Sequence, residues 1–272
     1  MERTRSVGDK AKLTVSVKNA ESSTQFLNGK EVNVQKQEVN ASMTATIEVL
    51  ELHENKENKR VAIQIEKFSG EIDGQALSLK AGPRVIVTET KDGMAFVYEG
   101  GEEITDEKTV QVLSMLSELV VEDGEEKIAD DKIFKLTAPR SVGDAWQANH
   151  QLMAQDMAGD GALKIDEKDI TSNIKFEDIE AFNNEQCARL NIKVTMANLG
   201  IPSLAASGFT LEKSGGVITL TGLTPLDKQS IANKMNMSMQ MNFTAKTQIP
   251  QGTLLLKVAT MRTQQAEFTS VD

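Results

Sequence analysis

Arg5-Ser6-Val7-Gly8-Asp9 near the beginning of the chain is repeated as Arg140-Ser141-Val142-Gly143-Asp144 near its middle. Each copy precedes a stretch in which apolar and polar residues alternate. Self-similarity at a fixed period is the signature of a repeated structural unit, here of about 130 residues. The sequence therefore predicts two halves built in the same way, with Val7 and Val142 in equivalent places.

The glycine and the aspartate of each copy suggest a structural role. Gly8 and Gly143 permit an unusual backbone angle or a close approach. Asp9 and Asp144 are expected to accept hydrogen bonds from nearby backbone amides, a role that we favour over a catalytic one.

The similarity extends to two pairs of longer segments. Residues 47–51 and 59–65 align with residues 176–180 and 188–194, and a polar break lies within each pair. Two apolar-alternating runs around a short polar break are typical of a β-hairpin. We therefore expect one such hairpin in each half.

A further match joins residues 85–96 to residues 209–219. The first segment contains Asp92-Gly93 and the second contains Gly215-Gly216. These dipeptides favour the positive φ angles of a tight turn, so both segments predict a second hairpin.

Period-two alternation dominates the rest of the chain and predicts the fold class. One apolar face is expected for each of two early runs: Leu13, Val15 and Val17, then Val39, Ala41, Met43, Ala45, Ile47 and Val49. Such runs are typical of half-buried antiparallel strands. We predict a mainly β (α+β) protein made of duplicated, curled antiparallel sheets.

One segment has helical periodicity. Thr105-Asp106 can cap a helix of about residues 106–120, in which apolar or small residues recur every three or four positions: Val110, Leu113, Leu116, Ser117 and Val120. We expect this helix to pack on a sheet. Pro225-Leu226-Asp227 predicts the start of a shorter helix in the second half.

The domain organisation follows from the repeat. Residues 5–121 form the first β repeat with its helix, and residues 139–272 form the second. Residues 122–138, which are acidic and contain a glycine, are the expected linker.

Composition excludes some functions. The net charge of −10 and the pI near 4.9 argue against nucleic-acid binding, which needs clustered Lys and Arg. The single Cys187 cannot form an internal disulfide and falls in a predicted hairpin turn. No apolar run is long enough for a transmembrane segment. A cytoplasmic protein fits these features, and so does the mature part of an exported one, which the strand-rich texture favours.

The second copy carries a family resemblance. Val142-Gly143-Asp144 followed by Trp146, with Ala138-Pro139 before it, resembles the Val-Gly-Asp-x-Trp element of an uncharacterised family of bacterial secreted proteins and lipoproteins. The first copy departs from this element, because Ala11 stands where Trp is expected. The resemblance implies a periplasmic, secreted or envelope-attached protein and brings no catalytic residues. In architecture alone, long strands with one helix against them also resemble the open half-barrels of bacterial lipoprotein carriers.

The sequence offers little sign of catalysis, and we predict no enzyme activity and no cofactor. Nucleophile elbows, phosphate-binding glycine loops and zinc-protease patterns are absent. The two histidines, His53 and His150, lie far apart in the chain and beside no other typical ligand. We expect His53 in a solvated turn. His150 alternates with Trp146, Ala148 and Leu152, which predicts a partly buried histidine on a strand.

Residues Asp156–Glu167 imitate a calcium loop. Asp stands at positions 1 and 5, Gly at 6 and Glu at 12, but Ala158 removes the ligand at position 3. An EF-hand also needs helices on both sides, whereas residues 146–152 alternate like a strand. We favour a structural turn over a calcium site.

The methionines provide the candidate ligand-binding residues. Met235, Met237, Met239 and Met241 occupy alternate positions, and Ile231 and Phe243 extend the series. Period two predicts that these side chains share one apolar, buried strand face. Ordinary core packing, an adaptable wall for an apolar ligand, and a thioether site for Cu(I) are the three interpretations, and we expect no metal.

Two functions remain open. The first is a non-catalytic bacterial envelope or secreted protein that binds a lipid or another apolar or amphipathic ligand, with Met235, Met237, Met239, Met241 and Phe243 as ligand-binding residues. The alternative is a structural or protein-interaction module of the cell envelope with no small-molecule ligand. An apolar strand face looks the same in sequence whether it contacts core, ligand or partner.

Overall fold

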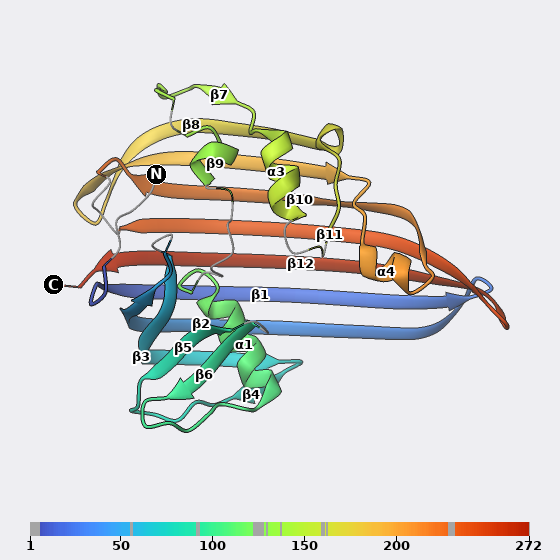
Figure 1. Cartoon of the computed structure of the whole chain (residues 1–272), viewed down its shortest axis with the longest axis horizontal. Coiled ribbons are helices and arrows are strands. Elements are labelled where there is room, and N and C mark those ends of the chain that lie inside the picture. The colour runs from blue at the N-terminus through green and yellow to red at the C-terminus, as the bar shows by residue number, and fades with distance from the viewer. Residues whose placement is uncertain are drawn as a thin grey trace.

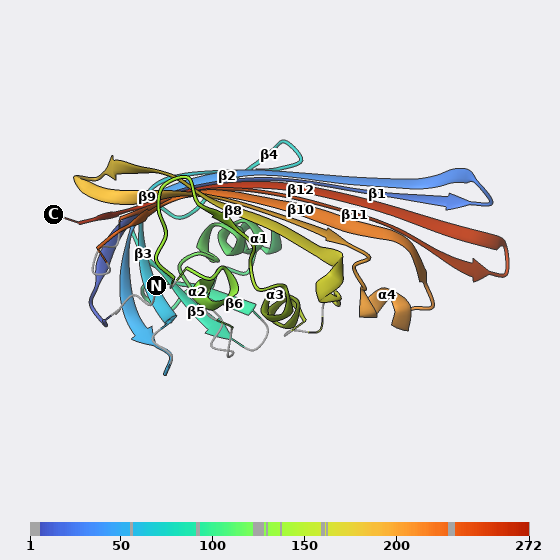
Figure 2. The ribbon, with the colours of Figure 1, turned by 90° about the horizontal axis from the view of Figure 1, so that it is seen from above.

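The fold is one large antiparallel sheet with short helices on one side (Figures 1 and 2). The computed structural model describes residues 6–54, 57–90, 93–121, 128, 130–136, 138–158, 161, 163–227 and 232–271. The prediction of a mainly β protein with few helices is confirmed.

The described part of the first repeat contains six strands and one helix: β1 (Lys10–Leu27), β2 (Lys30–Leu52), β3 (Asn58–Ile72), β4 (Gln75–Leu77), β5 (Val85–Thr90), β6 (Gly93–Tyr98) and α1 (Glu107–Ser117). Helix α2 (Asp130–Ile133) follows in the segment between the repeats. The second half contains the remaining elements: β7 (Ala145–Trp146), α3 (His150–Met157), a 3₁₀ turn (Glu167–Asp169), β8 (Ile170–Phe182), β9 (Glu185–Ala197), α4 (Pro202–Ala206), β10 (Thr210–Pro225), β11 (Asn233–Ile249) and β12 (Gly252–Ser270).

Each half is a meander of antiparallel strands. The first strand of the chain, β1, pairs with the last, β12, and this pair joins the two halves. The strand order is β6-β5-β3-β2-β1-β12-β11-β10-β9-β8-β7, with β4 beside β3. β1 pairs with β12 along its length, from Ala11 opposite Ser270 to Leu27 opposite Leu254. The two repeats therefore contribute to a single continuous sheet, which the sequence did not indicate.

The repeated pentapeptide forms the same turn twice. The Asp9 carboxylate accepts a hydrogen bond from the Ser6 backbone N–H at 2.8 Å, and Asp144 accepts one from Ser141 at 2.8 Å. The backbone N–H of each aspartate in turn donates to the serine carbonyl, at 3.1 and 3.0 Å. The predicted structural role of both aspartates is confirmed.

The glycines of the two turns also match. Gly8 and Gly143 have φ angles of 92° and 95°. Their backbone N–H groups donate to the carbonyls of Val49 and Phe176, both at 2.8 Å. Val49 and Phe176 are thus the equivalent residues, two positions away from the sequence alignment, which set Phe176 against Ile47. The return strands keep the predicted offset, because Val61 faces Val49 as Leu190 faces Phe176, so the slip reflects a second hairpin that is two residues longer.

We predict that Asp9→Ala and Asp144→Ala each lower the free energy of unfolding by about 1 kcal/mol, because each removes one equivalent hydrogen bond. Urea denaturation followed by circular dichroism measures the effect. Val7→Ala and Val142→Ala are matched controls, because these side chains are 64% and 50% exposed. A clear loss for one aspartate alone would mean that the two turns do not have the same role.

The two predicted hairpins that follow these turns are confirmed. β2 and β3 form one of them, and β8 and β9 form the other. In the second, Asn183 and Asn184 have φ angles of 50° and 61°, as a two-residue hairpin turn requires. The match of residues 85–96 with residues 209–219 predicted a hairpin in both segments, and only the first prediction is confirmed. β5 and β6 form a hairpin, but Gly215-Gly216 lies inside the single strand β10.

The apolar residues of the strands face the helices and form two cores on the same side of the sheet. The first core joins α1 to β1, β2, β3, β5 and β6. The second joins α2 and α3 to β8 and β9. Both predicted runs, Leu13–Val17 and Val39–Val49, bury their apolar face in the first core. We call this side of the sheet the inner face.

Helix α1 confirms the strongest helical prediction. The Asp106 side chain caps it by accepting from the Thr109 backbone N–H at 2.8 Å. Its buried stripe contains Val112 where the periodicity suggested Val110. The helix approaches the sheet closely at Gly70 of β3, where a Cβ atom would lie 3.4 Å from the Val112 side chain. That distance is an ordinary contact, and a Cβ atom there would first meet the Phe68 ring of the same strand, at 2.9 Å, so the glycine mainly leaves room for this ring.

Two local expectations were wrong, and the expected linker holds a short helix. Residues 146–152 are not a strand: β7 ends at Trp146, and α3 begins at His150 because the Asn149 side chain accepts from Leu152 N–H at 3.2 Å. Pro225 ends β10, and Leu226 and Asp227 are not helical. The expected linker contains α2, whose Ile133 is buried in the second core. Gly124 lies outside the described residues.

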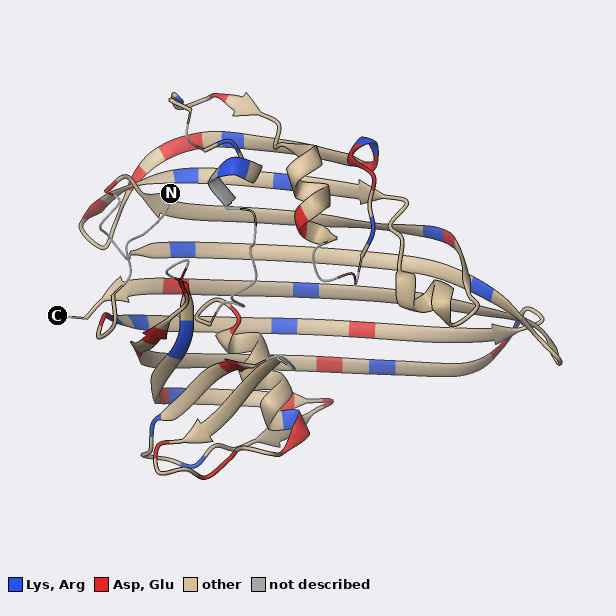
Figure 3. Cartoon of the chain, viewed as in Figure 1, with Lys and Arg blue, Asp and Glu red and all other residues tan. Residues whose placement is uncertain are grey.

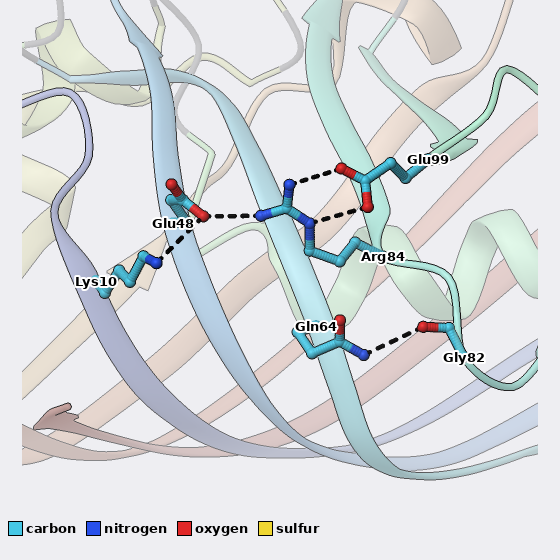
Figure 4. A network of polar contacts seen from close by, with 6 residues as sticks. All are labelled: Lys10, Glu48, Gln64, Gly82, Arg84 and Glu99. Carbon is cyan, nitrogen blue, oxygen red and sulfur yellow. Dashed lines mark hydrogen bonds and ion pairs between the residues drawn. The ribbon is translucent and has the colours of Figure 1, made fainter. Parts of the chain in front are cut away.

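An ion-pair network fixes the end of β6 to β2 (Figure 4). The Arg84 guanidinium donates to both carboxylate oxygens of Glu99, at 2.6 and 3.1 Å, and to Glu48 at 2.7 Å. Lys10 lies 3.7 Å from the same Glu48 carboxylate. The hydrogen bonds from Arg84 lower the pKa of Glu99 below its usual range.

This pKa direction predicts a pH effect. A carboxylate whose folded pKa is lowered stabilises the fold above its ordinary pKa, and the contribution is lost as the pH falls through the lowered value. Acidification should therefore lower the Tm of the wild type more than that of Glu99→Gln, so that the difference seen at neutral pH shrinks. Thermal melts at several pH values test this, with the exposed Glu21→Gln as control. An unchanged difference down to acid pH would contradict the assignment.

Candidate functional site

The methionine series lies on the inner face of β11. Register places Met235, Met237, Met239 and Met241 opposite Ala266, Gln264, Arg262 and Thr260 of β12, and opposite Gly222, Leu220, Ile218 and Gly216 of β10. Phe243 continues the series opposite Val258. The predicted common face is confirmed, and Ile231 lies outside the described residues.

The four thioethers are half-buried rather than fully buried. Met235 packs against the first core and Met241 against the second. Among the described residues, Met237 and Met239 belong to neither core. They therefore stand between the parts of the inner face that α1 and α3 cover.

A glycine lets the second core reach β11. Gly216 of β10 lies between Met196 of β9 and Met241 of β11. A Cβ atom at Gly216 would lie 3.1 Å from the Met241 side chain and 3.3 Å from the Met196 side chain. The absence of a side chain therefore allows both methionines to close over β10.

The apolar surface continues along β12 beyond the methionines. Val258, Leu256 and Leu254 face inward in succession, with Leu27 of β1 opposite Leu254. All are half-buried, and the described cores include none of them. We name the inner-strip residues as Met237, Met239, Phe243, Val258, Leu256, Leu254 and Leu27. The β12 residues were not predicted, because Leu254-Leu255-Leu256 has no period-two alternation to mark one face.

A charged pair borders the inner strip on its α1 side. Arg262 of β12, opposite Met239, pairs with Glu118 at the end of α1. Their side chains are 15% and 33% exposed. Gln264, fully buried beside them, donates weakly to the Met115 carbonyl at 3.4 Å. The strip thus combines a flexible apolar wall with one partly buried charged group, as a site for an amphipathic molecule requires.

We predict that Met237→Leu and Met239→Leu change the free energy of unfolding by less than about 1 kcal/mol, since both swaps conserve volume and apolarity. Met239→Lys should cost about 1–3 kcal/mol, because the new ammonium group is partly desolvated and lies across from Arg262. Asn236→Lys, on the opposite and exposed face of β11, is the matched control. Chemical denaturation measures all four variants. Equal stability of Met239→Lys and Asn236→Lys would mean that position 239 is open to solvent.

The histidines lie away from the inner strip. His53 follows β2 and pairs with Glu89 of β5 at 3.0 Å, so it is not a solvated turn residue. His150 begins α3, and its Nε2 atom lies 2.9 Å from the Ser172 hydroxyl. It lines a shallow, polar hollow of about 370 Å³ together with Lys135, Ala148, Asn149, Gln151, Glu167 and Lys168. This open hollow lacks the apolar lining of a typical ligand pocket.

The first carboxylate of the calcium-like loop has another partner, and so does Asp166 next to the last position. Asp156 accepts from the Ile128 backbone N–H at 3.1 Å, and Asp166 pairs with Lys168 at 2.8 Å. Asp160 lies outside the described residues. A helix does precede the loop, contrary to the argument from residues 146–152, but β8 follows it. The structural turn stays our prediction for this segment.

Two further observations concern the rest of the described chain. Cys187 is buried in β9, and desolvation raises the pKa of its thiol, which disfavours the reactive thiolate. None of the helices in the described ranges has the length and apolar character needed to cross a membrane.

Comparison with known proteins gives no family. No protein-family model matches the sequence, and no curated protein matches it. Among solved structures, the chain is similar to the outer membrane protein OprG from Pseudomonas aeruginosa, with 9% identity over 98% of this chain and 100% of that chain and a TM-score of 0.19. It is also similar to the MucA/MucB complex of Pseudomonas aeruginosa, with 8% identity over 90% and 88% of the chains and a TM-score of 0.17. Likenesses this weak add nothing to the fold or the site.

Proposed function

We propose that this protein is a non-catalytic bacterial envelope or secreted protein that binds an apolar or amphipathic ligand along the inner strip. The observation that carries the proposal is the half-burial of Met237 and Met239 outside both described cores. Moving the exposed part of these apolar side chains out of water is favourable, so a second apolar surface that covers them is stabilised there. The extracytoplasmic location rests on the Val-Gly-Asp-x-Trp resemblance.

The length and chemistry of the strip favour a long, flexible chain. Met237 and Phe243 are six residues apart on β11, which spans about 20 Å at the usual rise per strand residue. Val258, Leu256 and Leu254 extend the strip along β12. The Arg262–Glu118 pair at its border suits a polar headgroup. Methionine walls repack around varied chains, so the ligand class is defined by shape and polarity.

Native mass spectrometry of freshly purified protein tests the proposal first, and a co-purified lipid is the expected result. Saturable, one-to-one binding of a fluorescent naphthylamine probe, displaced by long-chain amphiphiles, should accompany it. Phe243→Gln should weaken probe binding by about tenfold, since it removes one large apolar contact. Asn242→Gln, on the opposite face of the same strand, should leave binding unchanged.

Two results would favour the alternative, a structural or protein-interaction module of the envelope. One is a clean protein mass together with no saturable probe binding. The other is equal probe affinity in Phe243→Gln and Asn242→Gln. Thermal melts of both variants must show an intact fold, and Met239→Gln provides a nearly isosteric second variant if Phe243→Gln unfolds.

A further inference from the structure

Strands β1, β2, β11 and β12 extend past α1 and α3 to a common end, on the side away from both chain termini (Figures 1 and 2). We call this end, residues 24–36 and 244–258, the distal end. Asn28 joins its two hairpins: the side chain donates to the Gln251 carbonyl and accepts from Thr253 N–H, both at 3.0 Å. Asn28 N–H also donates to the Thr253 carbonyl at 3.0 Å. The distal end is therefore pre-organised.

At the distal end, β12 presents large apolar side chains on both faces of the sheet. Leu254 and Leu256 face inward, and Leu255 between them faces outward opposite Phe26. Val34 of β2 lies on the same outer face and is 43% exposed. The described helices all lie on the inner side of the sheet, so they leave this outer surface open (Figure 2).

Elsewhere on β1 and β12 the outer face is mostly polar, with Met261 as the exposed large apolar exception. Thr14, Ser16 and Lys18 of β1 stand opposite Glu267, Gln265 and Thr263 of β12. This is the normal composition of an antiparallel sheet with one face in water. The change to Phe26 and Leu255 near the turns therefore indicates a second apolar contact that only the distal end makes.

Charge identifies the kind of surface that makes this contact. The distal end carries Lys30, Lys36, Lys246 and Lys257 against one acidic residue, Glu31, although the whole chain has a net charge of −10. Lys246 lies opposite Leu255 and pairs with Glu212, and the Lys257 ammonium lies 5.0 Å from the centre of the Phe26 ring. Figure 3 shows how sparsely acidic residues occur toward this end of the strands. Lysines around an apolar tip complement phosphate headgroups above an acyl layer.

We propose that the distal end docks on an anionic phospholipid bilayer. Phe26 and Leu255 enter the boundary between headgroups and acyl chains, and Lys36 and Lys257 meet the phosphates. The turn residues Asn28-Gly29 and Pro250-Gln251 carry no charge, whereas Lys30 and Glu31 keep the insertion shallow. The inner strip reaches this end at Leu254, so docking brings that strip to the lipid surface. The inference does not depend on a ligand in the strip.

Vesicle flotation tests the proposal with the full chain. Binding is expected to phosphatidylcholine vesicles that contain a quarter phosphatidylglycerol, to weaken as salt is raised, and to be weak on phosphatidylcholine alone. The double variant Phe26→Ser/Leu255→Ser should reduce binding at least about tenfold. Met261→Ser is the matched control, because Met261 is exposed on the same face of β12 but outside the distal end. It should bind like the wild type.

A second measurement keeps the test independent of the folding of the serine variant. Leu255→Trp should be quenched by lipids brominated along the acyl chain, whereas Met261→Trp should be quenched far less. No flotation on anionic vesicles, or equal flotation of the double serine variant and Met261→Ser, would overturn the proposal. Concentration-dependent self-association that the serine substitutions abolish would instead assign the surface to a second copy of the chain.

The two proposals fail separately. Probe binding to the inner strip should be unchanged in Phe26→Ser/Leu255→Ser, because those side chains are on the outer face. Loss of probe binding in Phe243→Gln with normal flotation supports both assignments. If Phe243→Gln lost both probe binding and flotation, the distal end would not be a docking surface separate from the inner strip.

Discussion

The pairing of β1 with β12 is the constraint on which the rest of the structure depends. It joins residues near the two ends of the chain and places both repeats in one sheet with a single inner face. Because β1 and β12 are central strands, their apolar residues must be covered on that face. α1 and α3 cover the two sides, and the middle of the sheet, β11 with its methionines, lies between the two cores.

Because the sheet is built from two repeats, its inner face has a central region between two separate cores. Each repeat forms most of one core, although Ala266, Met235 and Phe268 of the second repeat join the first core. Gly216 lets Met241 and Met196 close over β10. Between these two well-packed regions, methionine side chains can repack at low cost.

The sequence predicted the local features well, because short-range rules control them. The Asp9 and Asp144 turns, the Asn183-Asn184 hairpin and the Asp106 cap all depend on residues a few positions apart. α3 was missed because Trp146, Ala148, His150 and Leu152 mimic strand alternation, although Asn149 offered a capping signal. The single-face methionine series was predicted, whereas Arg262 was not, since only the β11–β12 register brings it beside Met239.

The sequence by itself determined that this protein is a duplicated, mainly β chain with one strong helix and a methionine strand face. These properties follow from turn chemistry and from the two-residue and 3.6-residue periods of the backbone. Only the tertiary structure decided that the two repeats share one sheet, that Met237 and Met239 stand between two cores, and that Leu254–Leu256 is apolar on both faces of an uncovered end. Strand register across more than two hundred residues sets these contacts, and no local pattern encodes such a register.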